Sequence, residues 1–172
     1  MKYYLRITLS LLAICTVVAV LLAAVNIATR DTIAKNAQRE KEAAIASLYP
    51  SFSAITEDQR ACPPGVHTVY TVMENEALLG YAVSLESRGF GGMVQMMIGI
   101  GADGAVSGIR ILSHSETPGL GSRALDAGYL SNYLGLQTGE TVDGISGATF
   151  SSRAVQNGTA LALSLGLGGA DA

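Results

Sequence analysis

The sequence predicts an α+β protein in which a single N-terminal transmembrane helix and a helical stalk precede an antiparallel-strand-rich domain with two C-terminal helices. Three observations support this order. Residues 7–28 contain no charged residue, residues 69–112 hold short apolar runs separated by turn residues, and the chain after residue 121 returns to helical spacing. The predicted parts are a tail and transmembrane helix (1–30), a helical stalk and linker (31–65), a ligand-binding domain (66–166) and a disordered tail (167–172).

The uncharged run over residues 7–28 is long enough to cross a bilayer. At about 1.5 Å per residue it spans roughly 33 Å, close to the thickness of the hydrocarbon core. Its few hydroxyl side chains can bond back to carbonyls of the helix itself. The competing interpretation is a cleaved signal peptide, whose apolar core is usually about 7–15 residues. Small residues at Ala23, Ala24 and Ala28 keep cleavage open.

Flanking charge does not decide on which side of the membrane the rest of the chain lies. Lys2 and Arg6 precede the apolar run, and more basic residues follow it: Arg30, Lys35, Arg39 and Lys41. That excess favours a cytoplasmic location for the segment after the helix. Long domains, however, translocate largely regardless of flanking charge, so the orientation stays open on physical grounds.

The stalk and the linker differ in composition. Residues 31–48 are rich in alanine and can be capped by Asp31, and Pro50 cannot continue the helix. Residues 51–65 are polar and end in Pro63-Pro64-Gly65, so we expect a loop there.

The pattern then becomes extended. Strands are predicted at residues 69–73, 79–85, 93–100 and 106–112. Residues 74–76 form a turn region, and Gly101-Ala102-Asp103-Gly104 is a strong hairpin signal because Asp-Gly accepts positive φ. Two helices follow, over residues 122–134 and from Thr149 onward.

Composition argues against two classes of protein. The net charge is −3 and no basic stripe with interleaved aromatic residues occurs, so nucleic acid is not an expected partner. Of the two cysteines, Cys15 lies inside the apolar run. Cys62 therefore has no partner in its own domain, which argues against a disulfide framework.

The first segment that can carry chemistry is Ser115-Glu116-Thr117-Pro118-Gly119-Leu120-Gly121, between a predicted strand and a predicted helix. Its glycines would let the backbone approach a flat ligand closely. A plain Pro-Gly turn is the alternative. Residues 119–124 also fit the dinucleotide fingerprint G-x-G-x-x-A. In that fold the strand runs straight into the first glycine, whereas here several residues separate them, and too little chain follows to complete a doubly wound sheet.

The second segment is Asp143-Gly144-Ile145-Ser146-Gly147-Ala148-Thr149. Its small residues leave Thr149 accessible at the start of a helix, where unpaired backbone N–H groups favour a phosphate. One alternative is helix capping by Ser146, Thr149 or Ser151. Another is a serine hydrolase with Ser146 in a near match to G-x-S-x-G and His114 and Asp143 as partners, although residues 138–142 make a poor core strand.

Taken together and in this order, the two motifs resemble the FMN-binding domain of the RnfG/NqrC family. These are flavin-carrying subunits of the Rnf and sodium-pumping NADH:quinone oxidoreductase complexes. The resemblance covers the whole layout and includes Gly80-Tyr81-Ala82-Val83 and the glycines of residues 89–92, and the length is more similar to RnfG. It implies a membrane-anchored electron-transfer subunit of an Rnf-type ferredoxin:NAD⁺ oxidoreductase complex coupled to ion translocation, with its C-terminal domain outside the cytoplasm.

The resemblance also implies a cofactor and its site. A flavin transferase would move FMN from FAD onto Thr149, giving one FMN per chain, held by a phosphoester bond. The motif around that threonine contributes Asp143, Ser146, Gly147 and Ala148. The residues matching the loop that lies against the flavin are Glu116, Thr117, Leu120 and Gly121, and Phe90 is a candidate aromatic wall. The implied partners are the flavin transferase and the other Rnf subunits.

Two other functions stay open at the level of sequence. One is a stand-alone extracytoplasmic covalent flavoprotein that serves another reductase. The other is a non-catalytic membrane-anchored sensor or binding module whose Thr149 is never modified. A flavin spectrum would distinguish the unmodified sensor or binding module from the two flavoproteins. The identity of co-purifying subunits would distinguish the stand-alone flavoprotein from the Rnf subunit.

The orientation implied by the resemblance can be tested with a reporter. A reporter that works only after export should be active when fused after Ala172, because the domain is expected outside the cytoplasm. Activity of a cytoplasm-only reporter at the same site would contradict both the orientation and the carrier role. A mature protein that starts near Ala28 would instead support signal cleavage.

Overall fold

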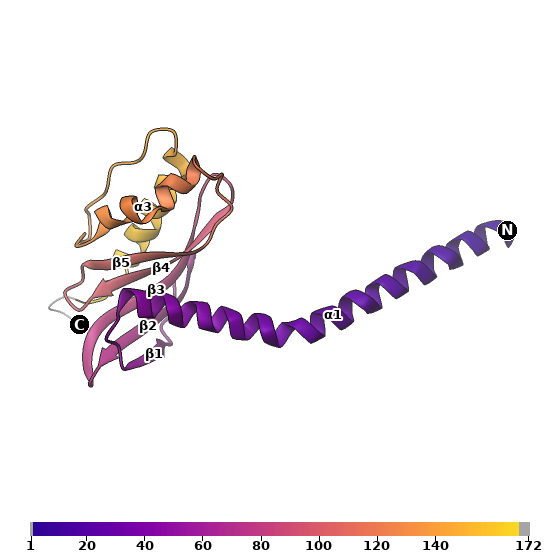
Figure 1. Ribbon diagram of the computed structural model, residues 1–172, viewed down its shortest axis with the longest axis horizontal. Helices are drawn as coiled ribbons and strands as arrows, with labels where there is room; N and C mark the ends of the chain where they lie inside the picture. The colour runs from indigo at the N-terminus through magenta and orange to yellow at the C-terminus, as the bar shows by residue number, and fades with distance from the viewer. Residues whose placement is uncertain (1, 169–172) are drawn as a thin grey trace. The chain divides into compact units, whose positions relative to one another are not determined.

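The structure is a computed structural model that describes residues 2–168, apart from the side chains of residues 2, 31, 34 and 37 (Figure 1). The contacts within the chain form two compact units, with the boundary between Lys41 and Glu42. The helix α1 (Lys2–Leu48) supplies the first unit and the opening residues of the second.

Most of the first unit is a long apolar stretch of helix. The stretch Tyr3–Arg30 has 28 residues, reaches a mean hydropathy of 2.7 and buries none of its most apolar window, so its length and composition suit a membrane span. The hydroxyls of Thr8 and Thr16 donate to the carbonyls of Tyr4 and Leu12 at 2.9 and 2.8 Å. The hydroxyls are thus satisfied within the helix, as predicted.

The second unit is built on a five-stranded antiparallel sheet whose strands lie side by side in sequence order. The strands are β1 (Ala54–Asp58), β2 (Val66–Glu74), β3 (Ala77–Arg88), β4 (Met93–Gly101) and β5 (Val106–Ser113). The four strands predicted from the sequence are confirmed, each longer than expected. The prediction of a loop throughout residues 51–65 is wrong, because β1 pairs there with β2 from Ala54↔Met73 to Asp58↔Val69. β1 is a largely exposed edge strand, so it lacks the apolar run that marks the other four.

The hairpin turns follow the predicted chemistry. Asn75 and Glu76 both adopt positive φ, 47° and 68°, as a two-residue turn between twisted strands requires. In the hairpin between β4 and β5 the Gly101 N–H donates to the Ala105 carbonyl at 2.8 Å, and Gly104 takes φ 81°. Asp103 accepts from the Ala105 N–H at 3.1 Å, which closes the turn.

The predicted helix over residues 122–134 is present only in pieces. It consists of the 3₁₀ turn η1 (Gly121–Leu125), the short helix α2 (Ala127–Leu130) and the 3₁₀ turn η2 (Ser131–Tyr133). Asp126 takes extended backbone angles, φ −74° and ψ 145°, so the helical hydrogen bonds cannot run through it. The last helix, α3 (Thr149–Leu163), begins at the predicted residue. Leu167, placed in the predicted tail, is buried in the core, and residues 169–172 lie outside the described residues.

The sheet is covered on both faces. On one face Val83, Leu85, Met96 and Ile98 belong to a core cluster with residues of α3 and the short helices. Figure 1 shows these helices over one face of the sheet. On the other face Ala82 and Met97 pack with the end of α1 and the residue that follows it, in a smaller cluster that includes Ala44, Ile45 and Tyr49. The central strands are therefore apolar on successive residues, as expected for a sheet buried on both sides.

Tyr49 joins the end of α1 to three strands. Its hydroxyl lies 2.9 Å from the Ile100 carbonyl and 3.1 Å from the Tyr81 carbonyl, and it accepts from the Ser107 hydroxyl at 2.9 Å. Burial raises the pKa of Tyr49, so the phenol keeps its proton. Small residues make room for this contact. Ala82, Gly99 and Gly108 lie in register across β3, β4 and β5, and a Cβ on Gly108 would come within 2.7 Å of Leu48.

We expect Tyr49→Phe to lower the free energy of unfolding of the full chain in detergent by about 1–3 kcal/mol, because it leaves a buried polar contact without its partner. Tyr70→Phe is the matched control. Tyr70 belongs to the same cluster, but its hydroxyl has no hydrogen bond within residues 2–168. Denaturant titration followed by tyrosine fluorescence measures both, and equal losses would contradict the role assigned to the Tyr49 hydroxyl.

Candidate functional site

The two predicted motifs meet at one pocket of about 250 Å³. Three separate segments of the chain form its walls: the glycine loop after β3, the loop that leads into η1, and the start of α3 with the residues before it. The lining residues are Phe90, Glu116, Thr117, Leu120, Gly121, Gly147, Ala148, Thr149, Phe150 and Ser151.

Glu116 connects all three segments. Its side chain is 5% exposed, and its Oε1 accepts from the Gly91 N–H at 3.0 Å. Its Oε2 accepts from the hydroxyl of Ser151, in the first turn of α3, at 2.6 Å. The Glu116 N–H donates to Nδ1 of His114 at 3.2 Å, which fixes the backbone as well. A buried carboxylate needs such donors, so this group holds the pocket walls together.

Glycines make room for that carboxylate. A Cβ on Gly89 would overlap Oε1 of Glu116. A Cβ on Gly121 would overlap Oε2 and come within 2.7 Å of the Ser151 hydroxyl. Gly89 and Gly121 are thus required by close approach within the protein itself, a role that the sequence did not distinguish from an approach to a ligand.

The loop before Thr149 is held by backbone acceptors. The Tyr129 hydroxyl donates to the Asp143 carbonyl at 3.0 Å, and the Gln156 amide donates to the Val142 carbonyl at 2.7 Å. Because Tyr129 uses its proton on Asp143, Tyr133 is the donor in the 3.1 Å bond between the two phenols. Burial, and then the bond with Tyr129, raise the pKa of Tyr133, so that donor persists over the physiological range.

Thr149 is the first residue of α3, and its side chain is exposed at the pocket. Ala148 occupies the N-cap position, and no side chain caps the helix. The alternative of helix capping by Ser146, Thr149 or Ser151 is therefore wrong, and Ser151 bonds instead to Glu116. Within the described residues the first backbone N–H groups of α3 have no hydrogen-bond partner, and an anionic group is favoured near such a helix start.

Exposed apolar side chains surround the pocket. Phe90 and Phe150 are 74% and 60% exposed, and their ring centroids lie 6.1 Å apart with an interplanar angle of 48°. Leu120, at 52% exposed, lies on the same pocket. An apolar cluster left open to solvent is typical of a site that binds a ligand or a partner. Phe150 and Ser151 were not predicted, and the only signal in the sequence was their position directly after Thr149.

Most of the predicted site residues lie at this pocket, but Asp143 and Ser146 do not line it. Asp143 contributes its backbone carbonyl to the bond with Tyr129. Within the described residues, the side chains of Ser146, His114 and Asp143 make no hydrogen bond with one another, which argues against the hydrolase alternative. The wholly antiparallel sheet excludes the dinucleotide fold, which needs parallel strands.

The chain is similar to known proteins over this same region. Residues 89–164 match the FMN-binding domain family. The G subunit of the ion-translocating oxidoreductase complex of Cereibacter sphaeroides (strain ATCC 17029 / ATH 2.4.9) is 30% identical over 159 residues, which cover 80% of this chain and 72% of that protein. The chain belongs to the RnfG family.

Other RnfG relatives match over similar or longer stretches. The G subunit of the Na⁺-translocating ferredoxin:NAD⁺ oxidoreductase complex of Acetobacterium woodii is 29% identical over 188 residues, covering 94% of this chain and 91% of that protein. The corresponding protein of the ion-translocating oxidoreductase complex of Escherichia coli O157:H7 is 26% identical over 161 residues, covering 80% and 78%. The matched FMN-binding region begins at Gly89 and includes both Glu116 and Thr149.

We expect Gly121→Ala to disturb the pocket and lower the free energy of unfolding by about 1–3 kcal/mol, because its methyl group would displace the Glu116 carboxylate. Gly128→Ala is the matched control, since a Cβ there has no atom of another residue within 4 Å and alanine favours a helix. Chemical denaturation of the two full-length variants checks this. Equal stability of the two variants would contradict the packing role of Gly121.

Proposed function

We propose that this chain is the membrane-anchored electron-transfer subunit of an Rnf-type complex and carries FMN on Thr149. The observation that supports it most is the convergence of Glu116, Leu120 and an exposed Thr149 hydroxyl on one pocket at the start of an uncapped helix. The relatives bear the names of subunits of ion-translocating and ferredoxin:NAD⁺ oxidoreductase complexes. Other subunits of such a complex are the proposed partners.

The residues of the pocket fit an FMN. The free N–H groups at the start of α3 suit its phosphate, and Phe90, Phe150 and Leu120 offer apolar surface to a flat ring. At about 250 Å³ the pocket is smaller than the roughly 300–1,000 Å³ of sites that enclose a whole ligand. Part of the cofactor would remain accessible to redox partners. When bound, FMN supplies one- and two-electron transfer, and the protein supplies position and electrostatics.

The proposed linkage is a phosphoester to Oγ1 of Thr149. In this step the Thr149 oxygen bonds to the phosphorus of the FMN half of FAD, the pyrophosphate bond breaks, AMP leaves, and the hydroxyl proton passes to solvent or to the flavin transferase. The loop bonds from Tyr129 and Gln156 would hold Thr149 in place, while its exposed side chain leaves room for the transferase. No acid or base of this chain is required.

The proposed location is the cell membrane, with the second unit outside the cytoplasm. The apolar stretch Tyr3–Arg30 is exposed all round, and lipid would cover that surface. A covalent tether suits this location, because an FMN lost outside the cytoplasm is not readily replaced. It also keeps the cofactor at high effective concentration beside its partners.

The linkage is tested by the intact mass and the in-gel fluorescence of denatured protein made together with a flavin transferase. The unmodified chain would carry no added mass, whereas the flavinylated chain carries one FMN. Thr149→Ala should abolish both signals, because it removes the acceptor oxygen. Ser146→Ala is the matched control and should retain flavin, since Ser146 is exposed and does not line the pocket. Covalent FMN on Thr149→Ala protein would overturn the assignment.

A further inference from the structure

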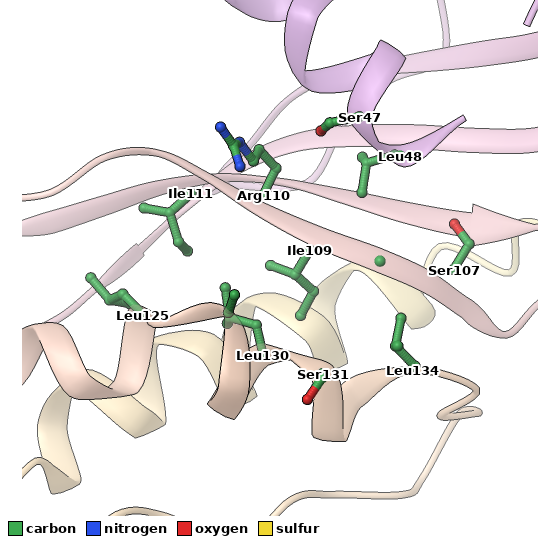
Figure 2. Close-up of a pocket in the computed structure, with 12 residues that line it drawn as sticks. Ser47, Leu48, Ser107, Ile109, Arg110, Ile111, Leu125, Leu130, Ser131 and Leu134 are labelled. Atoms are coloured by element: carbon green, nitrogen blue, oxygen red, sulfur yellow. The ribbon is translucent and has the colours of Figure 1, made fainter. Parts of the chain in front are cut away.

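A second cavity, of about 490 Å³, lies along the outer edge of β5. It shares no lining residue with the pocket at Thr149. Figure 2 shows the end of α1, with Ser47 and Leu48, on one side of β5, and Leu125, Leu130 and Leu134 on the other. The strand edge is thus recessed between two walls, and most of their side chains are apolar.

Only some of the backbone N–H and C=O groups on this edge of β5 have hydrogen-bond partners. At the start of β5 the Val106 N–H donates to the Leu136 carbonyl at 2.9 Å, and the Val106 carbonyl accepts from the Gly135 N–H at 2.8 Å. Beyond that point, residues 107–113 make no backbone hydrogen bond on this side within residues 2–168. Strand residues alternate between the two edges, and the register with β4 assigns Ile109 and Ile111 to the outer one. Their N–H and C=O groups are therefore open to pairing.

The two walls suit the two faces of an added strand. Figure 2 shows the side chains of Ile109 and Ile111 directed toward the wall formed by Leu125, Leu130 and Leu134. A strand placed beside β5 would lay alternate side chains on that wall and the intervening ones on the Leu48 side. The side chains of the added strand that face Leu125, Leu130 and Leu134 need to be aliphatic to fill the space between these leucines.

The charge of Arg110 indicates what the side chains of the added strand on the Leu48 side must contain. Arg110 is exposed on the Leu48 side of β5 and has no carboxylate within 4.0 Å among the side chains that the structure describes. A partner carboxylate would pair with it. Arg110 also lies near the middle of the free section, so symmetric antiparallel pairing with a second copy of this chain would bring two guanidinium groups together. Like charges directly opposite are destabilising, which disfavours a homodimer through this edge.

We propose that the β5 edge binds an extended segment of another polypeptide, which adds to the sheet as a sixth strand. That segment carries aliphatic side chains on the face toward Leu130 and an acidic side chain opposite Arg110. The inference rests on the proposed function only in that the chain has partner subunits, and it does not involve Thr149 or FMN.

Hydrogen–deuterium exchange resolved to single residues tests the pairing. The full chain is compared alone in detergent and in the detergent-solubilised complex isolated from its own cells. In the complex, exchange at the Ile109 and Ile111 amides should slow at least tenfold. The amides of Gly108 and Arg110, which face β4, should be slow in both samples and provide the internal control.

Each outcome of that comparison decides something. Unchanged exchange at Ile109 and Ile111 in a chain that does co-purify with other subunits overturns the added strand and leaves the proposed function intact. A chain that purifies without any partner overturns both. Protection that already occurs in the isolated chain and grows with its concentration assigns the edge to a second copy and overturns the proposal. Protection in the isolated chain that does not depend on its concentration would mean that detergent or another part of the same chain covers the β5 edge. That result also overturns the proposal.

A charge variant tests the acidic contact. Arg110→Glu should weaken retention of the chain in the complex at least tenfold, measured as the salt concentration that releases half of it. Arg110→Lys is the control and should retain most of the wild-type value, because it keeps the charge. Equal retention of the Glu and wild-type chains overturns the proposed carboxylate partner. Circular dichroism of the isolated variants verifies the fold, which is expected to be intact because Arg110 is exposed.

Discussion

A single buried carboxylate determines how the pocket is assembled. Removing Glu116 from water is unfavourable unless both of its oxygens find donors, and the donors come from Gly91 and Ser151. No side-chain polar atom that is buried in the described residues lacks a partner, so this requirement is met without an orphaned group elsewhere. These two bonds hold the first turn of α3 and the glycine loop to the Glu116 loop. The glycines at 89 and 121 follow in turn, because any side chain there would occupy the space of the carboxylate.

The chain separates rigidity from accessibility at Thr149. The loop before it is tied through backbone carbonyls by Tyr129 and Gln156, whereas the threonine hydroxyl itself is exposed. The proposed attachment of FMN to Thr149 would need both properties, since the acceptor oxygen would have to be reachable and to stay in one place. Asp143 belongs to this support through its backbone, which explains why a motif residue lies away from the pocket lining.

The sequence was sufficient wherever the determining contacts were local. Buried strands showed short apolar runs, the Asp103-Gly104 hairpin carried its own turn chemistry, and the start of α3 was marked by small residues before Thr149. It was insufficient where the cause lay far along the chain. β1 is an exposed edge whose partner is β2, and the break at Asp126 is a backbone conformation with no proline to mark it. Phe150 has the spacing of an ordinary helix residue, so only its place beside Phe90 distinguishes it.

Tyr49 has a mechanical consequence for a domain that hangs from an anchor. The chain enters the second unit through α1, and the first strand after it, β1, is an edge strand that pairs only with β2. The Tyr49 hydroxyl contacts Tyr81, Ile100 and Ser107, which belong to β3, β4 and β5, so the residue directly after α1 is bonded to three strands before the chain reaches β1. A pull transmitted through α1 would therefore act on these three strands before it reaches the single pairing of β1 with β2.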